Sequence, residues 1–406
     1  MKKYGVPFII TLVFFSCCCG YLEHTARVSF TGDIIMHIPV KSCSRNHNRI
    51  DPGNHSSINH RGFDFLFNKI RKSLMGSDIV VGNMEFPVSH PFTSIPWKFN
   101  CRPEVLPALK NAGFTMLTIA NNHILDQGQK GVRSTLSYLK KYSIDCIGAG
   151  CTEAGARAGI VREVNGIRIG FIAYTGVLNY PGPRTGSGFH INWLHEKEKV
   201  SDDIRNIRSR CDYLVMVSHY GSEYSLQPQK REKDLYRYFC GSGVDLIIGH
   251  HPHVLQPVER VTTPDNRTAY IFYSLGNFIS NQSSAFTLPG SGMVLSTRDS
   301  AIVTLMLRRP LFSSRLRASF EITPVRTDNH FERKTGIREI QTLSIPAEIE
   351  EYELALKTAP AGNKSRIKWR LQHLRNKIMT IQAVMLQKGN MESVKVSGTG
   401  EKQDRG

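Results

Sequence analysis

The amino-acid sequence predicts an α/β fold in which the strands of a largely parallel sheet alternate with helices. Three observations predict it: short β-rich runs recur along the chain, helix-like segments lie between them, and most runs end in polar, glycine-containing turns. The chain has 406 residues, of which 40% are hydrophobic and 21% charged, so it can bury a sizeable core and is neither wholly disordered nor collagen-like. Its formal net charge of +18 favours an anionic partner without identifying one.

The N-terminus is typical of an export signal. Two lysines precede the apolar run Val6–Phe15, which is shorter than the ~20 residues of a membrane-spanning helix and is followed by Ser16 and three consecutive cysteines. A small residue before a cysteine at this point resembles a bacterial lipoprotein cleavage site with Cys17 as the lipidated residue. We therefore expect residues 1–23 to be a signal peptide and lipoprotein anchor region of an exported protein that is membrane-anchored at the cell envelope. The alternative is an ordinary cleaved signal whose cysteines are incidental.

The cysteines further along the chain do not indicate a structural zinc site, because none of them has CxxC spacing. Cys146 and Cys151 are close enough in sequence to be a candidate disulfide pair. We expect most of these cysteines to be buried free thiols, since cysteine is among the most frequently buried residue types.

The predicted strands end where polar residues begin. In chain order the runs and the residues after them are Arg27–Thr31 before Gly32 and Asp33, Asp78–Val81 before Gly82–Glu85, Met116–Ala120 before Asn121–His123, Tyr213–Ser218 before His219, Asp245–Ile248 before Gly249–His253, and Tyr270–Ser274 before Leu275–Asn277. Because chemistry in parallel sheets sits at the carboxyl ends of strands, we expect these polar residues to gather at one edge.

Helices and further strands complete the predicted fold. The helix-like segments are Phe63–Met75, Pro103–Ala112, Val132–Tyr142 and Lys230–Cys240. Within Val161–Tyr174, the pair Asn165 and Gly166 separates two β-rich runs and predicts a hairpin with a type I′ turn. Val303–Leu307 and a run that ends near Val325 are expected to finish a second sheet.

After about Arg326 the sequence becomes helical and basic. Ile345–Lys357 is a predicted helix, and Lys364–Lys388 is a predicted amphipathic basic helix with a stripe of apolar residues, namely Ile367, Leu371, Leu374, Ile378, Ile381 and Met385. We expect this stripe to pack on the chain's own domain; the alternatives are a coiled-coil or partner helix and a helix that lies on anionic lipid. Gly389–Gly406 is expected to be a disordered tail.

Five clusters at strand ends hold nearly all the plausible metal ligands: Asp33, Glu85, Asn122 with His123 and Asp126, His219, and His251 with His253. Each cluster alone has a structural explanation, such as an aspartate that caps the next helix. Together, however, carboxylate, carboxamide and imidazole groups suit two divalent ions held ~3.5–4 Å apart. If the segment is extended, His251 and His253 point the same way and His250 faces away, so His250 is left out of the ligand set.

Six motifs in this order resemble the CapA family of poly-γ-glutamate capsule biosynthesis proteins, a branch of the calcineurin-like metallophosphoesterase superfamily. They are Gly32 with Asp33, GNME at Gly82–Glu85, NNHILDQG at Asn121–Gly128, SHYGSEY at Ser218–Tyr224, GHHPHVLQPVE at Gly249–Glu259 and YSLGNF at Tyr273–Phe278. The resemblance covers about Val28 to Val325. It implies a four-layer α/β/β/α sandwich in a domain at residues 24–330, followed at residues 331–406 by a basic helical extension and tail.

The resemblance also implies a role for each residue that matches a motif. Asp33 and His253 would hold the first ion, Asn122, His219 and His251 the second, and Glu85 would bridge the two. His123 would protonate the leaving oxygen or stabilise the transition state, and Asp126 would orient His123 by hydrogen bonding. Two divalent ions, Mn, Fe or Zn, would lower the pKa of the water that attacks phosphorus.

The sequence departs from typical phosphoesterases in ways that resemble the CapA branch. Ile35 stands where a ligating histidine is usual, and the bridging position carries Glu85 in place of aspartate. His37 is assigned to a position outside the ligand set, while Glu223 and Glu259 are assigned to loop orientation.

The predicted function is therefore that of a CapA-like cell-envelope protein with a dinuclear metal site, involved in biosynthesis or export of capsule or poly-γ-glutamate. It is expected to hydrolyse a phosphoester or an amide such as a γ-glutamyl bond. The alternative is a non-catalytic, membrane-anchored component that binds or exports an anionic polymer. Expected partners are such a polymer or a phosphorylated or γ-glutamyl substrate, the membrane through the lipid anchor, and other capsule-synthesis membrane proteins. Nucleic acid is disfavoured, because no nucleic-acid-binding motif accompanies the positive charge.

Overall fold

The computed structural model describes residues 23–50, 60–182, 188–311, 313, 315–387 and 391–398. The predicted signal and anchor region, residues 1–23, lies outside the described residues except for Glu23. None of the described helices has the length and apolarity needed to cross a bilayer.

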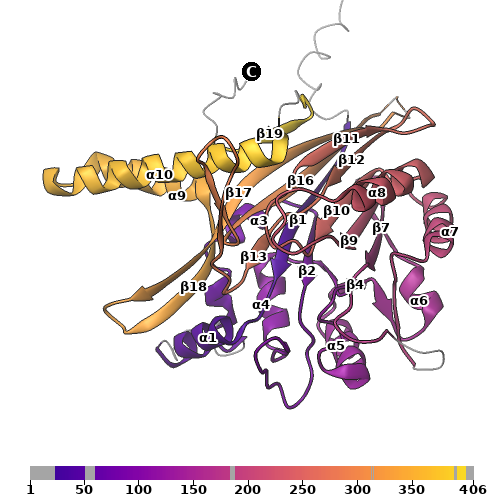
Figure 1. Cartoon of the computed structure of the whole chain (residues 1–406), viewed down its shortest axis with the longest axis horizontal. Helices are drawn as coiled ribbons and strands as arrows, with labels where there is room; N and C mark the ends of the chain where they lie inside the picture. Colours follow the sequence, from indigo (N-terminus) through magenta and orange to yellow (C-terminus); the bar gives the residue numbers. More distant parts are fainter. Residues whose placement is uncertain are drawn as a thin grey trace, which may run out of the picture.

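The strands form two main sheets (Figure 1). The larger sheet contains β1 (Glu23–Ile34), β2 (Ile79–Met84), β3 (Met116–Thr118), β4 (Asp145–Ile147), β13 (Asn277–Ile279), β16 (Asp299–Pro310), β17 (Arg317–Glu332), β18 (Ile337–Ser344) and β19 (Val394–Val396). The smaller sheet contains β6 (Ile160–Val164), β7 (Ile167–Thr175), β9 (Tyr213–His219), β10 (Leu246–His250), β11 (Val258–Thr262) and β12 (Thr268–Phe272). Two short ribbons pair β5 (Ala149–Gly150) with β8 (His190–Ile191), and β14 (Ala285–Thr287) with β15 (Val294–Ser296).

Helices connect and cover these sheets. They are α1 (Ile38–Ile50), the 3₁₀ turn η2 (Phe63–Leu66), α3 (Arg71–Leu74), α4 (Val105–Ala112), α5 (Gly128–Lys141), α6 (Glu153–Arg157), α7 (Lys197–Arg208), α8 (Lys230–Ser242), α9 (Ile345–Thr358) and α10 (Ala361–Leu386). The segment 63–75, predicted as one helix, is instead divided between η2 and α3, with a turn between them.

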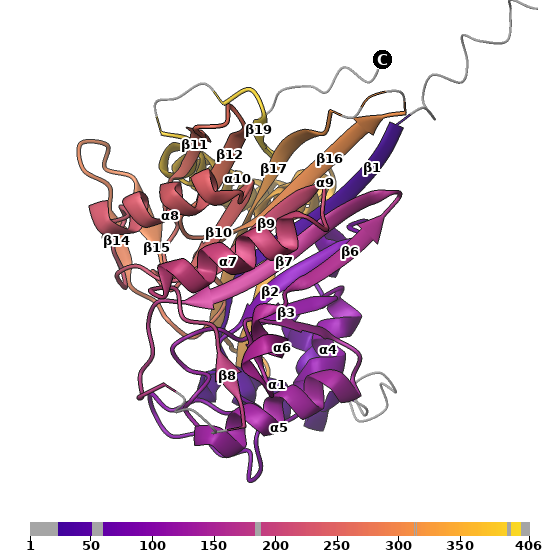
Figure 2. The same ribbon diagram turned by 90° about the vertical axis from the view of Figure 1, so that its right-hand side faces the viewer.

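The described residues confirm the α/β class and form the α/β/β/α sandwich that the resemblance implies. The apolar inner faces of the two sheets pack against each other, with Phe30 of β1 and Val215 of β9 in the same cluster. Helices α1, α4 and α5 pack on the outer face of the larger sheet, and α7 and α8 pack on the outer face of the smaller one (Figure 2). Each sheet is therefore buried on both faces along its centre, which explains the nearly continuous apolar runs of its parallel strands.

The smaller sheet is parallel at its centre and antiparallel at both edges, whereas the larger sheet is antiparallel only on the side of β16, β17 and β18. In the larger sheet β1, β2, β3 and β4 are parallel, whereas β16 runs antiparallel to β1, with Val28 opposite Leu305. The prediction that Val303–Leu307 and the run to Val325 finish a second sheet is wrong, because these residues lie in β16 and β17 beside β1. Apolar runs of this kind fit either sheet, so the sequence pattern alone does not identify the neighbouring strand.

The C-terminal region packs on the sandwich. Helices α9 and α10 confirm the two predicted helices, and buried residues of the α10 stripe join the inner core cluster, as expected. The prediction of a disordered tail from Gly389 is wrong for Val394–Val396, which pair with β17 because both valines bury their side chains there. The domain boundary placed between residues 330 and 331 stays a prediction, and β17 runs through that point.

Two local predictions have clear outcomes. Asn165 and Gly166 both have positive φ, 47° and 74°, as the predicted type I′ hairpin between β6 and β7 requires. Cys146 and Cys151 are both free thiols, so the candidate disulfide is wrong, and four of the free cysteines in the described residues are buried.

A close approach of two backbones fixes the end of β1. A Cβ atom on Gly32 would lie 2.1 Å from the carbonyl oxygen of Gly276, a distance at which the backbone has to shift. The next residue, Asp33, donates its N–H to this same oxygen at 2.9 Å and pairs with Asn277 of β13. Gly32 therefore allows the loop before β13 to lie directly against the residue that leads into the candidate site.

We predict that Gly32→Ala lowers the free energy of unfolding by about 3 kcal/mol, because the added methyl group forces β1 and the Gly276 loop apart. Urea denaturation followed by circular dichroism measures this change. The matched control is Gly362→Ala in α10, where the added methyl group meets open space. That variant is expected to be unchanged or more stable by up to about 1 kcal/mol. An equal loss in both variants contradicts the prediction.

A candidate metal centre at the strand ends

Both sheets contribute strand ends to one buried cluster. Asp33 is the last residue but one of β1, and Glu85 directly follows β2, both strands of the larger sheet. His219 ends β9, and His251 and His253 follow β10, both in the smaller sheet. Asn122 and His123 lie in the loop after β3. All of these side chains are buried, so the convergence expected from strand-end polarity is found.

Glu85 lies at the centre of the cluster. Its Oε1 atom is 3.8 Å from His253 Nε2, 3.9 Å from His123 Nε2 and 4.0 Å from His219 Nε2. Within the described residues neither carboxylate oxygen has a hydrogen-bond partner, although the side chain is fully buried. Burying a carboxylate without a partner costs several kcal/mol, so this arrangement is favourable only when positive charge lies close by.

Asp33 fixes the orientation of two histidine rings. Its Oδ2 atom lies 3.1 Å from Nδ1 of His253, and that nitrogen is also 3.0 Å from Oδ1 of Asn277. Both oxygens can only accept a hydrogen bond, so Nδ1 of His253 carries the proton. The other ring nitrogen of His253, Nε2, faces Glu85. The other oxygen of Asp33, Oδ1, lies 2.9 Å from Nδ1 of His250.

Asn83 links the halves of the cluster. Its Nδ2 group donates to Asp33 Oδ1 at 2.7 Å and lies 3.1 Å from Nδ1 of His219. Because Asn83 offers hydrogens there, Nδ1 of His219 accepts, and its Nε2–H then donates to Asn122 Oδ1 at 2.9 Å. Asn122 and His219 therefore lie side by side, and metal binding through Nε2 of His219 would displace the proton of this hydrogen bond.

The predicted acid and its orienting carboxylate are also in contact. Nδ1 of His123 donates to Oδ2 of Asp126 at 2.7 Å, and the same oxygen accepts the backbone N–H of Phe99. The ring of His123 stacks on Phe99 with the two centroids 4.0 Å apart. The contacts leave Nε2 of His123 directed toward Glu85 and a cavity of about 330 Å³ that both residues line.

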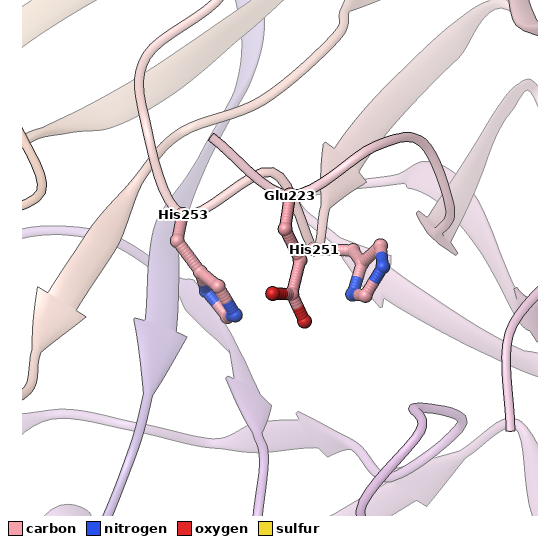
Figure 3. Close-up of side chains that lie close together, drawn as sticks. All are labelled: Glu223, His251 and His253. Carbon is pink, nitrogen blue, oxygen red and sulfur yellow. The ribbon is translucent and has the colours of Figure 1, made fainter. Parts of the chain in front are cut away.

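Glu223 is a further candidate ligand that the sequence assigned only to loop orientation. It lies in the loop after β9, and its carboxylate lies close to the rings of His251 and His253, with ligand atoms of all three within 4.8 Å of one another (Figure 3). Asp33, Glu85 and His253 form a second group within the same distance. Glu259 lies apart from these groups and accepts hydrogen bonds from Arg237 and Tyr273, as an orienting residue would.

The His250–His253 segment is not extended, so that assumption of the sequence analysis is wrong. His251 has φ 97° and His253 φ 59°, which turns the chain back on itself after β10. His250, the last residue of β10, contacts Asp33 although it was left out of the ligand set. The signal that identifies it is its register, since His250 lies directly opposite His219 in the parallel pair of β10 and β9. His37, also placed outside the ligand set, lines the cavity and accepts the backbone N–H of Asn281 at 3.2 Å through Nδ1.

The electrostatics of the cluster favour a positive charge between the carboxylates. Burial acts to raise the pKa of Asp33, but the contacts with His250 and His253 hold it well below its ordinary value. Burial raises the pKa of Glu85 well above its ordinary value. Burial acts to lower the pKa of His253, yet Glu85 and Asp33 raise it to about 9, whereas burial and the charge of His253 lower the pKa of His251 to about 4. His251 is therefore a neutral imidazole at pH 7, the form that binds metals.

The residues fit divalent cations. Two atoms bound to one ion at ~2.0–2.2 Å each can lie at most ~4.4 Å apart, so the distances from Glu85 to the three imidazoles allow shared ions. Imidazole, carboxylate and carboxamide groups suit Mn, Fe or Zn. The unpartnered oxygens of Glu85 are the observation that carries this fit.

Comparison with known proteins gives a family match. The profile of the family described as "Bacterial capsule synthesis protein PGA_cap" matches residues 27–282. The chain is 30% identical over 341 residues to the PGA biosynthesis protein CapA of Bacillus subtilis (strain 168), covering 79% of each chain. It is 31% identical over 293 residues to the capsule biosynthesis protein CapA of Bacillus anthracis, covering 69% of this chain and 64%, just under two thirds, of that protein.

Solved structures resemble the chain more loosely. A novel phosphatase of Mycoplasma pneumoniae has a TM-score of 0.41 and 15% identity, covering 74% of this chain and 94% of its own. The NAD nucleotidase NadN of Haemophilus influenzae has a TM-score of 0.43 and 11% identity, covering 88% of this chain and 61% of its own. No functional conclusion follows from likenesses at this level.

We predict that Glu85→Gln raises the free energy of unfolding by roughly 1–3 kcal/mol at pH 8 in the presence of a chelator, because burial disfavours the charged form of Glu85 by more than the attraction of His253 favours it. The same variant is expected to lose most of the stabilisation that the wild type gains from Mn²⁺ or Zn²⁺, about 2.7 kcal/mol at a hundredfold excess over Kd. Urea denaturation with chelator and with each metal measures both effects. Glu259→Gln, outside the cluster, is the matched control and should keep the full response to metal. A full metal response in Glu85→Gln contradicts the prediction.

Proposed function

Because the chain belongs to the PGA_cap family of bacterial capsule synthesis proteins, we propose that it is a metal-dependent hydrolase that acts in the synthesis or export of an anionic capsule polymer. The proposed reaction is hydrolysis of a phosphoester or of an amide such as a γ-glutamyl bond. The observation that carries this proposal is the buried carboxylate of Glu85, which accepts no hydrogen bond from the described residues and faces three imidazoles.

The strand-end residues would hold two divalent ions. The proposed ligands are Asp33, Glu85, Asn122, His219, His251 and His253, with Glu223 as a further carboxylate on the solvent side. Bound ions would polarise the oxygen of the scissile group and lower the pKa of a water molecule. Asn83 and Asn277 hold Asp33 and His253 in place through the hydrogen bonds described above, which limits the reorganisation needed when ions and substrate bind.

His123 is the proposed proton donor. Its Nδ1–H is occupied by Asp126, so a protonated ring can give up a proton only through Nε2, which faces the cavity. This geometry suits transfer of a proton to the leaving oxygen or nitrogen. Asp126 keeps the ring in this orientation, and Phe99 restricts its rotation by stacking.

A second candidate function, binding or export of an anionic polymer without catalysis, is favoured by the net charge of +18. The two functions differ in what the metal ligands do. If the protein only binds polymer, loss of the ligands leaves polymer affinity intact and there is no turnover to lose.

We predict that the purified protein with Mn²⁺ or Zn²⁺ hydrolyses generic phosphoesters or γ-glutamyl amides, and that His123→Ala lowers kcat by about 10²–10³-fold. Asp126→Asn should lower kcat by about 10–100-fold, because it weakens the orientation of the ring. Elemental analysis should find metal retained in both variants and lost in Asp33→Ala. Turnover by none of the metal-loaded preparations, together with no bound metal in the wild type, would falsify the proposed hydrolase.

We also propose that the protein is exported and held at the cell envelope by a lipid on Cys17, since a short apolar run and a small residue precede this cysteine. Mass spectrometry of the protein purified from the membrane fraction should find an acylated N-terminal Cys17. Cys17→Ser should shift the protein from the membrane fraction to the soluble one. An unmodified mature N-terminus beyond Cys19 contradicts the anchor.

A further inference from the structure

A second cavity, of about 450 Å³, lies near the metal centre and is lined by basic side chains. We call it the basic pocket and define it by Lys41, Arg45, Arg61 and Arg102. Lys41 and Arg45 come from α1, whereas Arg61 and Arg102 come from segments that precede η2 and α4. None of the described residues that line the basic pocket is acidic.

Most of the charge in this pocket is not neutralised by carboxylates. Lys41 donates to the hydroxyl of Ser94 and to the carbonyl oxygen of Asn100, at 2.9 Å for the latter. Arg45 donates to the Ser42 hydroxyl at 2.8 Å, and the guanidinium of Arg102 lies 5.7 Å from the centroid of the Phe92 ring.

Of the four cations of the basic pocket, only Arg61 has a carboxylate partner in the described part of the chain. This partner is Glu104, at 2.7 Å. Three cations that share one cavity without counter-charges repel one another, and a bound anion would relieve that repulsion.

A third cavity lies between the basic pocket and the metal centre. A middle cavity of about 380 Å³ shares Ile38 and Ser94 with the basic pocket. The same middle cavity shares Trp97, Phe99 and Tyr224 with the cavity at the metal centre. The three cavities therefore lie next to one another in a row, which we call the trough, from Glu85 and His123 to Lys41 and Arg45.

The middle of the trough presents apolar and aromatic surface to solvent. The side chain of Trp97 is 80% exposed and that of Ile95 is 61% exposed, and both line the middle cavity. Trp97 also has a positive φ of 66°, which the surrounding chain has to hold against the usual preference of a bulky residue. An exposed tryptophan in a strained backbone beside a cavity is typical of a binding surface.

We propose that the basic pocket binds a carboxylate of an extended anionic chain whose reacting bond lies at the metal centre. The ligand class is a linear polymer with regularly spaced carboxylates joined by short apolar linkers, such as γ-linked polyglutamate. Arg45 and Arg102 hold the carboxylate by charge-assisted hydrogen bonds, and Trp97 and Ile95 contact the methylene groups of the linkers. The identification of the reacting bond rests on the proposed hydrolase, whereas binding at the pocket does not.

The test measures binding separately from turnover. Isothermal titration calorimetry of the full-length protein in detergent, with a γ-linked decamer of glutamate as the probe, gives the affinity at two salt concentrations. We expect the double variant Arg45→Gln with Arg102→Gln to bind the decamer at least tenfold more weakly, with a shallower dependence on salt. Both arginines are exposed and make no ion pair in the described residues, so the variant should fold, which a thermal melt checks.

The matched control removes the same charge elsewhere. Lys364→Gln with Lys368→Gln lies on the exposed side of α10, which is at the upper end of the molecule in both views, whereas α1 is at the lower end (Figures 1 and 2). This control should bind the decamer with nearly wild-type affinity. Trp97→Ala should weaken decamer binding but leave the weak binding of inorganic phosphate unchanged.

Three results would overturn the proposal. They are no binding of the decamer to the wild type, an equal loss of affinity in the α10 control, and binding of inorganic phosphate as tight as that of the decamer, which would make the pocket a site for a free anion. Turnover of a small generic substrate at the metal centre should be unchanged in the α10 control. If no hydrolysis is found with any metal, the calorimetric result still decides whether the pocket binds the polymer.

Discussion

The structure depends on the burial of two carboxylates, Asp33 and Glu85, at the edge where two sheets meet. Burying an unpaired carboxylate opposes folding by several kcal/mol, so the surrounding chain has to supply compensation. Asp33 receives it from Asn83, His250 and His253, whereas Glu85 receives no hydrogen bond from the described residues. Because only one of these two similar carboxylates is compensated, we infer that Glu85 faces a positively charged ligand. When that ligand is absent, the buried carboxylate lowers the stability of the fold.

The sandwich architecture explains how residues from distant parts of the sequence reach this edge. Parallel strands of both sheets end on the same side, so each loop that follows such a strand begins close to the others. The close packing of Gly32 against the Gly276 loop brings β13 beside Asp33, and Asn277 of β13 then sets the orientation of His253. Backbone packing and side-chain orientation are coupled here, because moving the loop would also rotate a candidate ligand.

The sequence predicts the location of the site better than its detailed geometry. The polar residues at the strand ends were sufficient to predict that Asp33, Glu85, His219 and His253 lie together, because the carboxyl ends of parallel strands meet at one edge. The approach of His251 and His253 to the same cluster as His250, and the nearness of Glu223 to His251, depend on a turn with positive φ, and no residue in the segment 250–253 is a glycine that would signal it. The sheet to which β16 belongs and the pairing of β19 depend on contacts between segments that are distant in the sequence. The local pattern of apolar residues does not specify such contacts.

The two proposed functions, catalysis and polymer binding, can be combined in one protein. A metal centre would act on one bond at a time, whereas a polymer with identical repeats offers many equivalent bonds. Contacts made only at the centre cannot hold such a polymer in register. Contacts remote from the reacting bond can fix the register and use their binding energy to position the substrate. The row of three cavities has the arrangement that such positioning would need: cations in the basic pocket, apolar surface in the middle cavity, and the candidate metal centre at the other end.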